Sequence, residues 1–126
     1  MNYNTRIVEA LKPVGLIVFP GFYNSKITYY DDKGKEIPKQ KEWIAFNYVN
    51  EKPSLHADDE DVFTSTIIDV HCFTPDKSRA LHFKRQIKNC LRNAEFVIDS
   101  ASNEDEVDTG LTHVIVTISD NDDTEV

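Results

Sequence analysis

Four carboxylates stand side by side where Asp58, Asp59, Glu60 and Asp61 follow His56 and precede an apolar run. Such a run could hold a calcium ion, supply a catalytic acid pair, or keep a loop in solvent. Calcium loops take oxygen ligands at alternating positions, with a glycine for the sharp turn and a late bidentate acid. This stretch has no glycine, and adjacent carboxylates cannot all converge on one ion. We therefore expect an exposed connection here and no metal site.

The histidines and cysteines show no spacing that suits a metal or an activated nucleophile. Zinc sites need four convergent Cys and His ligands, but His71 and Cys72 are neighbours on an expected strand and point to opposite faces. Cys90 falls on the apolar stripe of an expected helix, so we expect both thiols to be free and buried. Asp69 shares the face of His71, and a structural pair is favoured there. An enzyme that uses Asp69, His71 or Cys72 is the least favoured alternative, and no cofactor is expected.

Length and charge limit the class of protein. The chain has 126 residues, which suits a single domain over residues 1–126. Twenty-two acids face 14 bases, a net charge of −8, which argues against a DNA-wrapping protein and against an anionic membrane surface. No apolar run reaches the roughly 18 residues of a membrane span, and residues 1–13 lack the pattern of a signal peptide. We expect a soluble protein.

Apolar periodicity predicts two helices and a mainly antiparallel sheet. A short helix is expected over residues 4–11, and a long one begins with Thr74 as N-cap and Pro75 at the first helical position. The expected strands are residues 14–19, 42–49, 62–73, 95–99 and 111–119. The predicted fold is therefore α+β, with the long and the short helix packed on one side of the sheet.

Two segments are expected to leave this body. Residues 26–41 are rich in lysine and poor in apolar side chains, which indicates a projecting hairpin or loop with its turn at residues 32–35. The lysines of this arm that we expect to dock a partner are Lys33, Lys35, Lys39 and Lys41. Residues 120–126 are acidic and are expected to form a flexible tail.

The long helix has a basic flank beside its core stripe. The residues of this flank are Lys77, Leu81, Lys84, Arg85, Lys88 and Arg92. They could be a solvated helix surface. Alternatively, the flank could meet the acids Asp58, Asp59, Glu60 and Asp61 of another copy in a head-to-tail contact, which closes into a ring if the rotation permits. Opposite charges would speed such assembly and fix its register.

Residues 43–75, "WIAFNYVNEKPSLHADDEDVFTSTIIDVHCFTP", resemble the centre of the small tail-completion proteins of long-tailed bacteriophages, the tail terminator and head–tail joining group. In that group an aromatic strand, a proline and a small acidic turn lead into a longer strand that ends in an aromatic residue. A helix, an acidic loop and a closing strand such as "GLTHVIVTIS" follow. The resemblance covers residues 10–119.

The resemblance implies a structural, non-enzymatic protein of the virion. Members of the group form a ring, usually of six subunits, at the head-proximal end of the tail, where the ring stops tube growth and joins the tail to the head. The implied partners are other copies, the tail-tube protein and a head-completion or neck protein. DNA would pass through an acidic lumen without binding. The expected location is the virion tail, with assembly in the host bacterial cytoplasm. The alternative is a small monomeric adaptor for an acidic protein partner.

Overall fold

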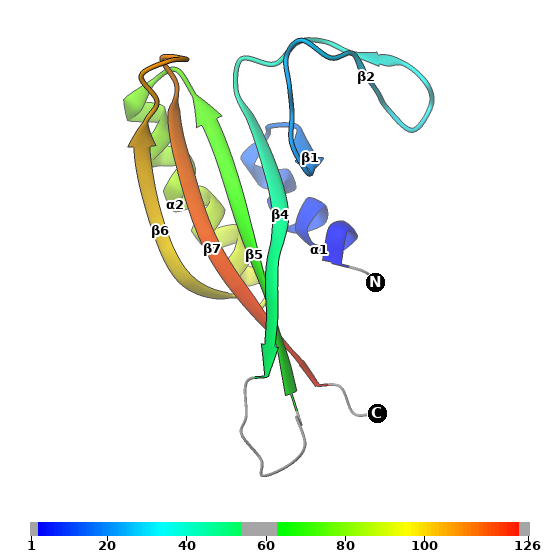
Figure 1. Cartoon of the computed structure of the whole chain (residues 1–126), viewed down its shortest axis with the longest axis vertical. Coiled ribbons are helices and arrows are strands. Elements are labelled where there is room, and N and C mark those ends of the chain that lie inside the picture. The colour runs from blue at the N-terminus through cyan, green and yellow to red at the C-terminus, as the bar shows by residue number, and fades with distance from the viewer. Residues whose placement is uncertain (1–2, 54–62, 124–126) are drawn as a thin grey trace.

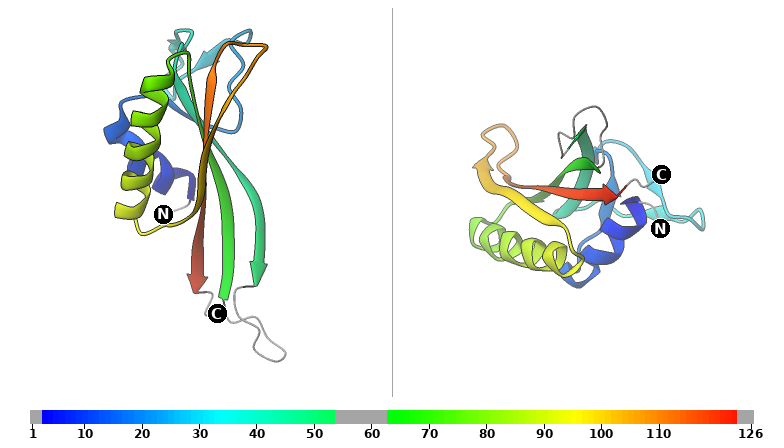
Figure 2. Two further views of the ribbon diagram at one scale, coloured as in Figure 1. Left: turned by 90° about the vertical axis from the view of Figure 1, so that its left-hand side faces the viewer. Right: turned by 90° about the horizontal axis from the view of Figure 1, so that it is seen from below.

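A five-stranded mixed sheet with two helices on one face forms the body of the protein, as Figures 1 and 2 show. The computed structural model describes residues 3–53 and 63–123. The elements are α1 (Tyr3–Leu11), a 3-10 turn (Lys12–Val14), β1 (Val18–Pro20), β2 (Tyr29–Tyr30), β3 (Glu36–Ile37), β4 (Trp43–Pro53), β5 (Phe63–Thr74), α2 (Lys77–Asn93), β6 (Val97–Asp105) and β7 (Thr112–Asp123). The predicted α+β class is confirmed.

The strand order is β1-β4-β5-β7-β6, and only β1 runs parallel to its neighbour. The two long central strands, β5 and β7, pair over their whole length. The parallel β1 is three residues long, shorter than the strand expected over residues 14–19. β6 is longer than expected, because residues 100–105 continue to pair with β7 after residue 99.

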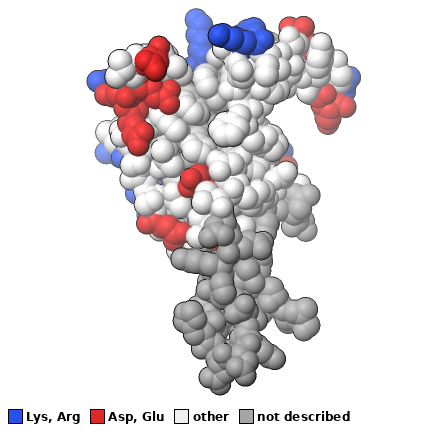
Figure 3. Space-filling view, in the orientation of Figure 1, with Lys and Arg blue, Asp and Glu red and all other residues white. Residues whose placement is uncertain are grey.

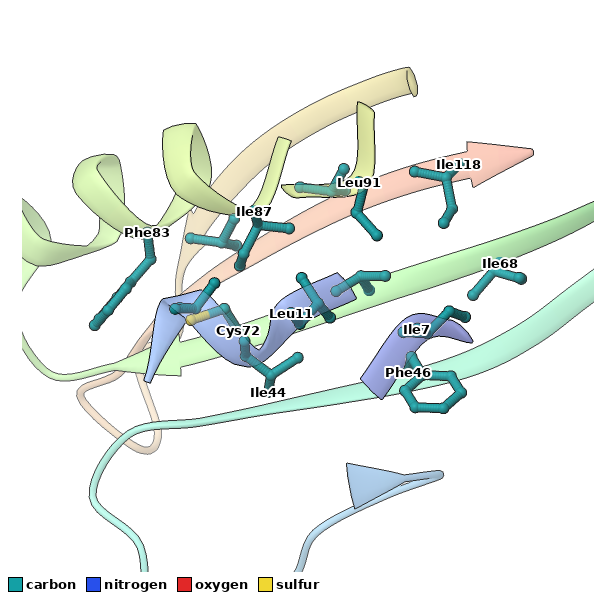
Figure 4. Packing of buried hydrophobic residues seen from close by; sticks show 14 of the residues in the cluster. Ile7, Leu11, Ile44, Phe46, Ile68, Cys72, Phe83, Ile87, Leu91 and Ile118 are labelled. Atoms are coloured by element: carbon teal, nitrogen blue, oxygen red, sulfur yellow. The ribbon is translucent and has the colours of Figure 1, made fainter. Parts of the chain in front are cut away.

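The core lies between the helices and the sheet (Figure 4). On α2, Ala80, Phe83, Ile87 and Leu91 are buried, as the helical spacing predicts. On β5, the alternation from Thr66 through Cys72 places every second side chain in this core. Cys90 is half-buried and packs against the edge of the same cluster.

Helix α2 begins two residues later than the sequence suggested. Asp76 is its N-cap, and the carboxylate accepts hydrogen bonds of 2.8 and 3.3 Å from two backbone N–H groups of the first turn. The prediction that Thr74 caps the helix and Pro75 opens it is wrong. Thr74 still belongs to β5, and its buried hydroxyl donates to Glu42 at 2.6 Å. The hydroxyl of Thr74 is thus engaged with Glu42, the residue just before β4, and the carboxylate of Asp76 caps the helix instead.

The last strand continues into the segment that was expected to be a flexible tail. β7 ends at Asp123, and residues 120–123 pair with β5. Arg6 of α1 forms an ion pair of 2.5 Å with Asp120 and lies over the ring of Phe96. The prediction of a tail from residue 120 is therefore wrong for residues 120–123, and residues 124–126 lie outside the described part.

The strands β4 and β6 each contain a register shift. In β4 the shift lies between Tyr48 and Asn50, and in β6 it lies between Ile98 and Ser100. The two shifts flank the same rung of the central strands β5 and β7. An extra residue of this kind bends a strand and increases its local twist.

Residues 26–41 contain the expected hairpin. β2 and β3 pair in antiparallel fashion and extend away from the main sheet in Figure 1. In the turn, Asp31 Oδ1 accepts hydrogen bonds from the backbone N–H groups of Lys33 at 2.9 Å and Lys35 at 2.8 Å. Gly34 supplies the left-handed conformation, with φ of 81°. We call residues 26–41 the arm.

Candidate functional site

The cations of the predicted basic flank divide into two groups. Lys77 Nζ lies 3.0 Å from Asp105 Oδ2, and Lys84 Nζ donates to Asn103 Oδ1 at 2.8 Å. Both partners belong to β6, so these two lysines are engaged by the acidic stretch of their own chain. They bind the helix to the edge of the sheet and are less suited to a neighbouring molecule than the sequence alone suggested.

The remaining members of the flank form a separate surface. Leu81, Arg85, Lys88 and Arg92 follow one another at intervals of four, three and four residues, which places them on one side of α2. Within residues 3–53 and 63–123, no ion pair joins these three cations to an acid. Leu81, at the N-terminal end of this series, is 42% exposed. We call these four residues the outward stripe. The acids expected to meet them, residues 58–61, lie outside the described part.

The sheet face opposite the helices has no covering layer among the described residues; we call it the open face. Figure 3 views this face, and its centre is largely uncharged. Acidic side chains gather at one end, over the turn between β6 and β7, and at the arm. The open face is therefore largely uncharged, with acidic side chains at its borders.

A line of four neighbouring rings, two of its three contacts stacked and one tilted, crosses one end of the open face. Trp43, Phe73 and His113 lie opposite one another on β4, β5 and β7, and Tyr23 continues the line beyond the sheet. Their centroids are 4.9, 4.9 and 4.3 Å apart in the order Tyr23, Trp43, Phe73 and His113. We call these four rings the aromatic row. Cross-strand aromatic pairs of this kind stabilise a sheet and fix its register.

A pocket of about 730 Å³ lies beside the aromatic row. Its walls come from the loop after β1, the segment before β4, and the turn between β6 and β7. Tyr23, Trp43 and Phe73 contribute rings, and Glu106 and Lys41 are the only charged side chains of the lining among the described residues. The pocket is thus mainly apolar and has one acid and one base at its rim.

Two histidines on the open face are linked in a chain of hydrogen bonds. His71 Nε2 lies 2.7 Å from Asn47 Oδ1, and His71 Nδ1 lies 2.8 Å from His113 Nε2. With the Asn47 oxygen as acceptor, His71 carries its proton on Nε2 and accepts from His113. Asp69 accepts a hydrogen bond from Thr117 at 2.6 Å. It interacts with His71 through its charge, so the two groups form the expected structural pair.

Both imidazoles favour the neutral state. Burial lowers the pKa of His71, and the neighbouring His113 lowers it further, while Asp69 opposes this change. Burial likewise lowers the pKa of His113, against the opposing carboxylates of Glu106 and Glu104. Glu106 Oε2 is 3.5 Å from His113 Nδ1, so a proton added there would be held between them.

The cysteines are free thiols, as expected. Burial raises the pKa of Cys72 to about 12, with a further contribution from Glu42. Burial also raises the pKa of Cys90. Such thiols are poor nucleophiles at neutral pH. Among the described residues, no group of three or more His, Cys, Asp or Glu side chains could hold a metal ion.

The arm is fixed to the body at its base and exposes its lysines. The exposed lysines are Lys33, Lys35, Lys39 and Lys41. Lys39 Nζ donates to the backbone oxygen of Ser25, and the Tyr29 hydroxyl accepts from the backbone N–H of Asn24 at 2.9 Å. The Tyr29 ring also packs against Phe19 and Tyr23. These contacts hold the base of the arm beside the pocket.

No family model and no curated protein matches this chain. None of the described helices is long and apolar enough to span a membrane.

Proposed function

We propose that the protein is a structural subunit that joins head to tail with other copies into a ring and completes a bacteriophage tail. The main support is the outward stripe, where an exposed leucine is followed along the helix by three cations that pair with none of the chain's described acids. Acids gather elsewhere, at the turn between β6 and β7. Two unlike surfaces on one subunit suit a contact that repeats around a ring.

The order of the elements is consistent with the family that the sequence resembles. An aromatic strand, β4, and a longer strand, β5, are followed by helix α2, an acidic turn and the closing strand β7. This is the order of elements in the tail-completion proteins. The open face and the projecting arm also leave surfaces for other proteins, while the fold itself does not specify a partner.

In this proposal the ring, of six subunits as is usual in the family, stops growth of the tail tube and joins it to the head. The arm, with its exposed lysines, docks an acidic surface of the tail-tube protein or of the neck protein. DNA passes through the ring without binding, because the net charge of −8 on each subunit disfavours contact with phosphate. The protein then belongs to the virion tail and assembles in the host cytoplasm.

Light scattering coupled to size-exclusion chromatography tests self-assembly directly. We expect an oligomer that dissociates as salt is raised, because the contact joins opposite charges. Arg85→Glu combined with Lys88→Glu should hinder assembly, whereas Lys33→Glu combined with Lys35→Glu, an equal charge change in the exposed turn of the arm, should not. A strict monomer at every concentration and salt would contradict the proposal. A monomer that forms a salt-sensitive one-to-one complex with an acidic protein would instead support the adaptor alternative.

A further inference from the structure

We infer, on the basis of the proposed self-assembly, that the pocket beside the aromatic row receives Leu81 of a neighbouring copy. The cations of the neighbour's outward stripe then meet the acids of the turn between β6 and β7. The proposed function requires only that copies join; this inference names the receiving surface and the residues that form both halves of the contact.

The pocket suits an aliphatic side chain better than a cation. The rings of Trp43 and Phe73 stack at 4.9 Å with an angle of 22° between their planes, so their facing surfaces are covered by each other. The covered ring faces are the part of an aromatic side chain that attracts a cation. What remains at the pocket is mainly apolar ring edge, together with Pro75 and Leu111. The volume of about 730 Å³ can take a leucine and the helix surface around it.

The rim of the pocket has acidic side chains, which are complementary to the cations of the outward stripe. Glu106 lines the pocket, and Glu104 and Asp108 are exposed on either side of it in the chain. Asp105 is already engaged by Lys77, so it is not part of this acceptor. The acids available to a neighbour are therefore Glu104 and Asp108, next to an apolar recess.

The outward stripe provides the complementary half. Leu81 is exposed one turn before Arg85 on the same side of α2, and neither Arg85 nor Lys88 has an ion-pair partner among the described residues. An apolar anchor next to charged side chains matches the usual arrangement of an interface, in which an apolar centre adjoins a polar rim.

The two halves lie on different sides of one subunit. The outward stripe belongs to α2, which covers one face of the sheet (Figure 2). The pocket is lined by Trp43 and Phe73, whose neighbours Ile44 and Cys72 point into the core under the helices, so these two rings lie on the opposite face. One copy therefore cannot satisfy its own pocket with its own stripe. The contact must pass from each copy to the next, which is the head-to-tail geometry of a closed ring.

A charge exchange between two variants tests the pairing. The stripe variant has Arg85→Glu and Lys88→Glu, and the rim variant has Glu104→Lys and Asp108→Lys; all four residues are at the surface. Each variant alone places like charges across the contact, so we expect its self-association to weaken by roughly tenfold or more. In a one-to-one mixture every contact again joins opposite charges, so the mixture should assemble with the two variants alternating. Native mass spectrometry would show equal numbers of each variant.

Trp43 gives a direct reading of the pocket, because it is the only tryptophan in the chain. Entry of Leu81 excludes water from the indole, so its fluorescence should move to shorter wavelength as the unaltered protein assembles. Leu81→Ala should reduce both the shift and the affinity. Val97→Ala removes a similarly exposed apolar side chain from β6 and serves as the matched control.

The outcomes separate the inference from the proposed function. Rings that form normally from either charge variant, or a mixture that stays dissociated, would overturn the pairing while leaving self-assembly intact. Assembly without any change in Trp43 fluorescence would also overturn it. If the unaltered protein never associates, the proposed function fails and the inference fails with it.

Discussion

The hydrogen-bonded histidines on the open face should make stability depend on pH in a range where carboxylates do not titrate. Both rings have a native pKa below the ordinary value of 6.5, chiefly because they are buried. The unfolded chain therefore takes up protons on His71 and His113 before the native protein does. The contribution of the two neutral histidines to stability is fully present above the pKa that histidine has in the unfolded chain. It is lost as the pH falls toward the lower pKa that these histidines have in the native protein.

The size of the effect follows from linkage. Between about pH 7.5 and about pH 5.5, a histidine protonated only in the unfolded chain lowers the free energy of unfolding by about 1.4 kcal/mol. Two such residues set an upper limit of about 2.7 kcal/mol. Because water reaches these half-buried rings and screens the interaction, we expect about 1–2 kcal/mol.

Urea unfolding followed by circular dichroism at both pH values measures this loss. The variant with His71→Gln and His113→Gln should lose much less stability between the two conditions than the unaltered protein. His82→Gln is the matched control, because His82 is exposed on α2 and has no part in the chain of hydrogen bonds. An equal loss in the double variant and the control would refute the assignment of neutral, buried imidazoles.

Three further changes test the core and the start of α2. In a Cys90→Ser variant, Cys72 should react with a thiol reagent only after urea is added, since burial raises its pKa to about 12; rapid reaction of the folded variant would contradict this. Ile87→Ala should lower the free energy of unfolding by about 2–5 kcal/mol, because the side chain is fully buried, whereas the exposed Asn89→Ala should change it little in the same urea titration. The pKa of Glu42 is lowered chiefly by its hydrogen bond with Arg79. Its contribution is therefore present above its ordinary pKa of 4.5 and is lost as the pH falls through the native value, so Glu42→Gln should be less stable at neutral pH and show a shallower acid unfolding curve.

The elements with a strong period could be predicted from the sequence. The stripe of α2 and the alternation of β5 each place apolar residues on one face at a fixed interval, so burial follows from local geometry. β6 shows the opposite case, because residues 100–105, "SASNED", have weak strand propensity. They form a strand because β7 offers a complete row of backbone partners beside them. The parallel β1 likewise depends on pairing with β4, which no local pattern records.

The candidate site could be predicted only in part. Helical spacing places Leu81, Arg85 and Lys88 together, but it cannot show that Lys77 and Lys84 are engaged by β6. The aromatic row depends on the register between strands that are far apart in the sequence. The available signal was the aromatic residues at the ends of two neighbouring strands, the first residue of β4 and the next-to-last of β5. The loop residue Tyr23 offered no comparable signal.

The paired register shifts in β4 and β6 have a consequence for how the sheet meets strands of other molecules. A straight edge strand presents a regular row of unpaired backbone N–H and C=O groups. These groups can pair with a strand of another molecule, and repeated pairing produces amyloid-like fibrils. Here the edge strand β6 and β4, which pairs with β1 only at residues 44–46, are each bent at the same level of the sheet. A strand from another molecule could form backbone hydrogen bonds with only a few residues before the bulge interrupted the pairing. The distortion therefore protects the chain against fibril growth.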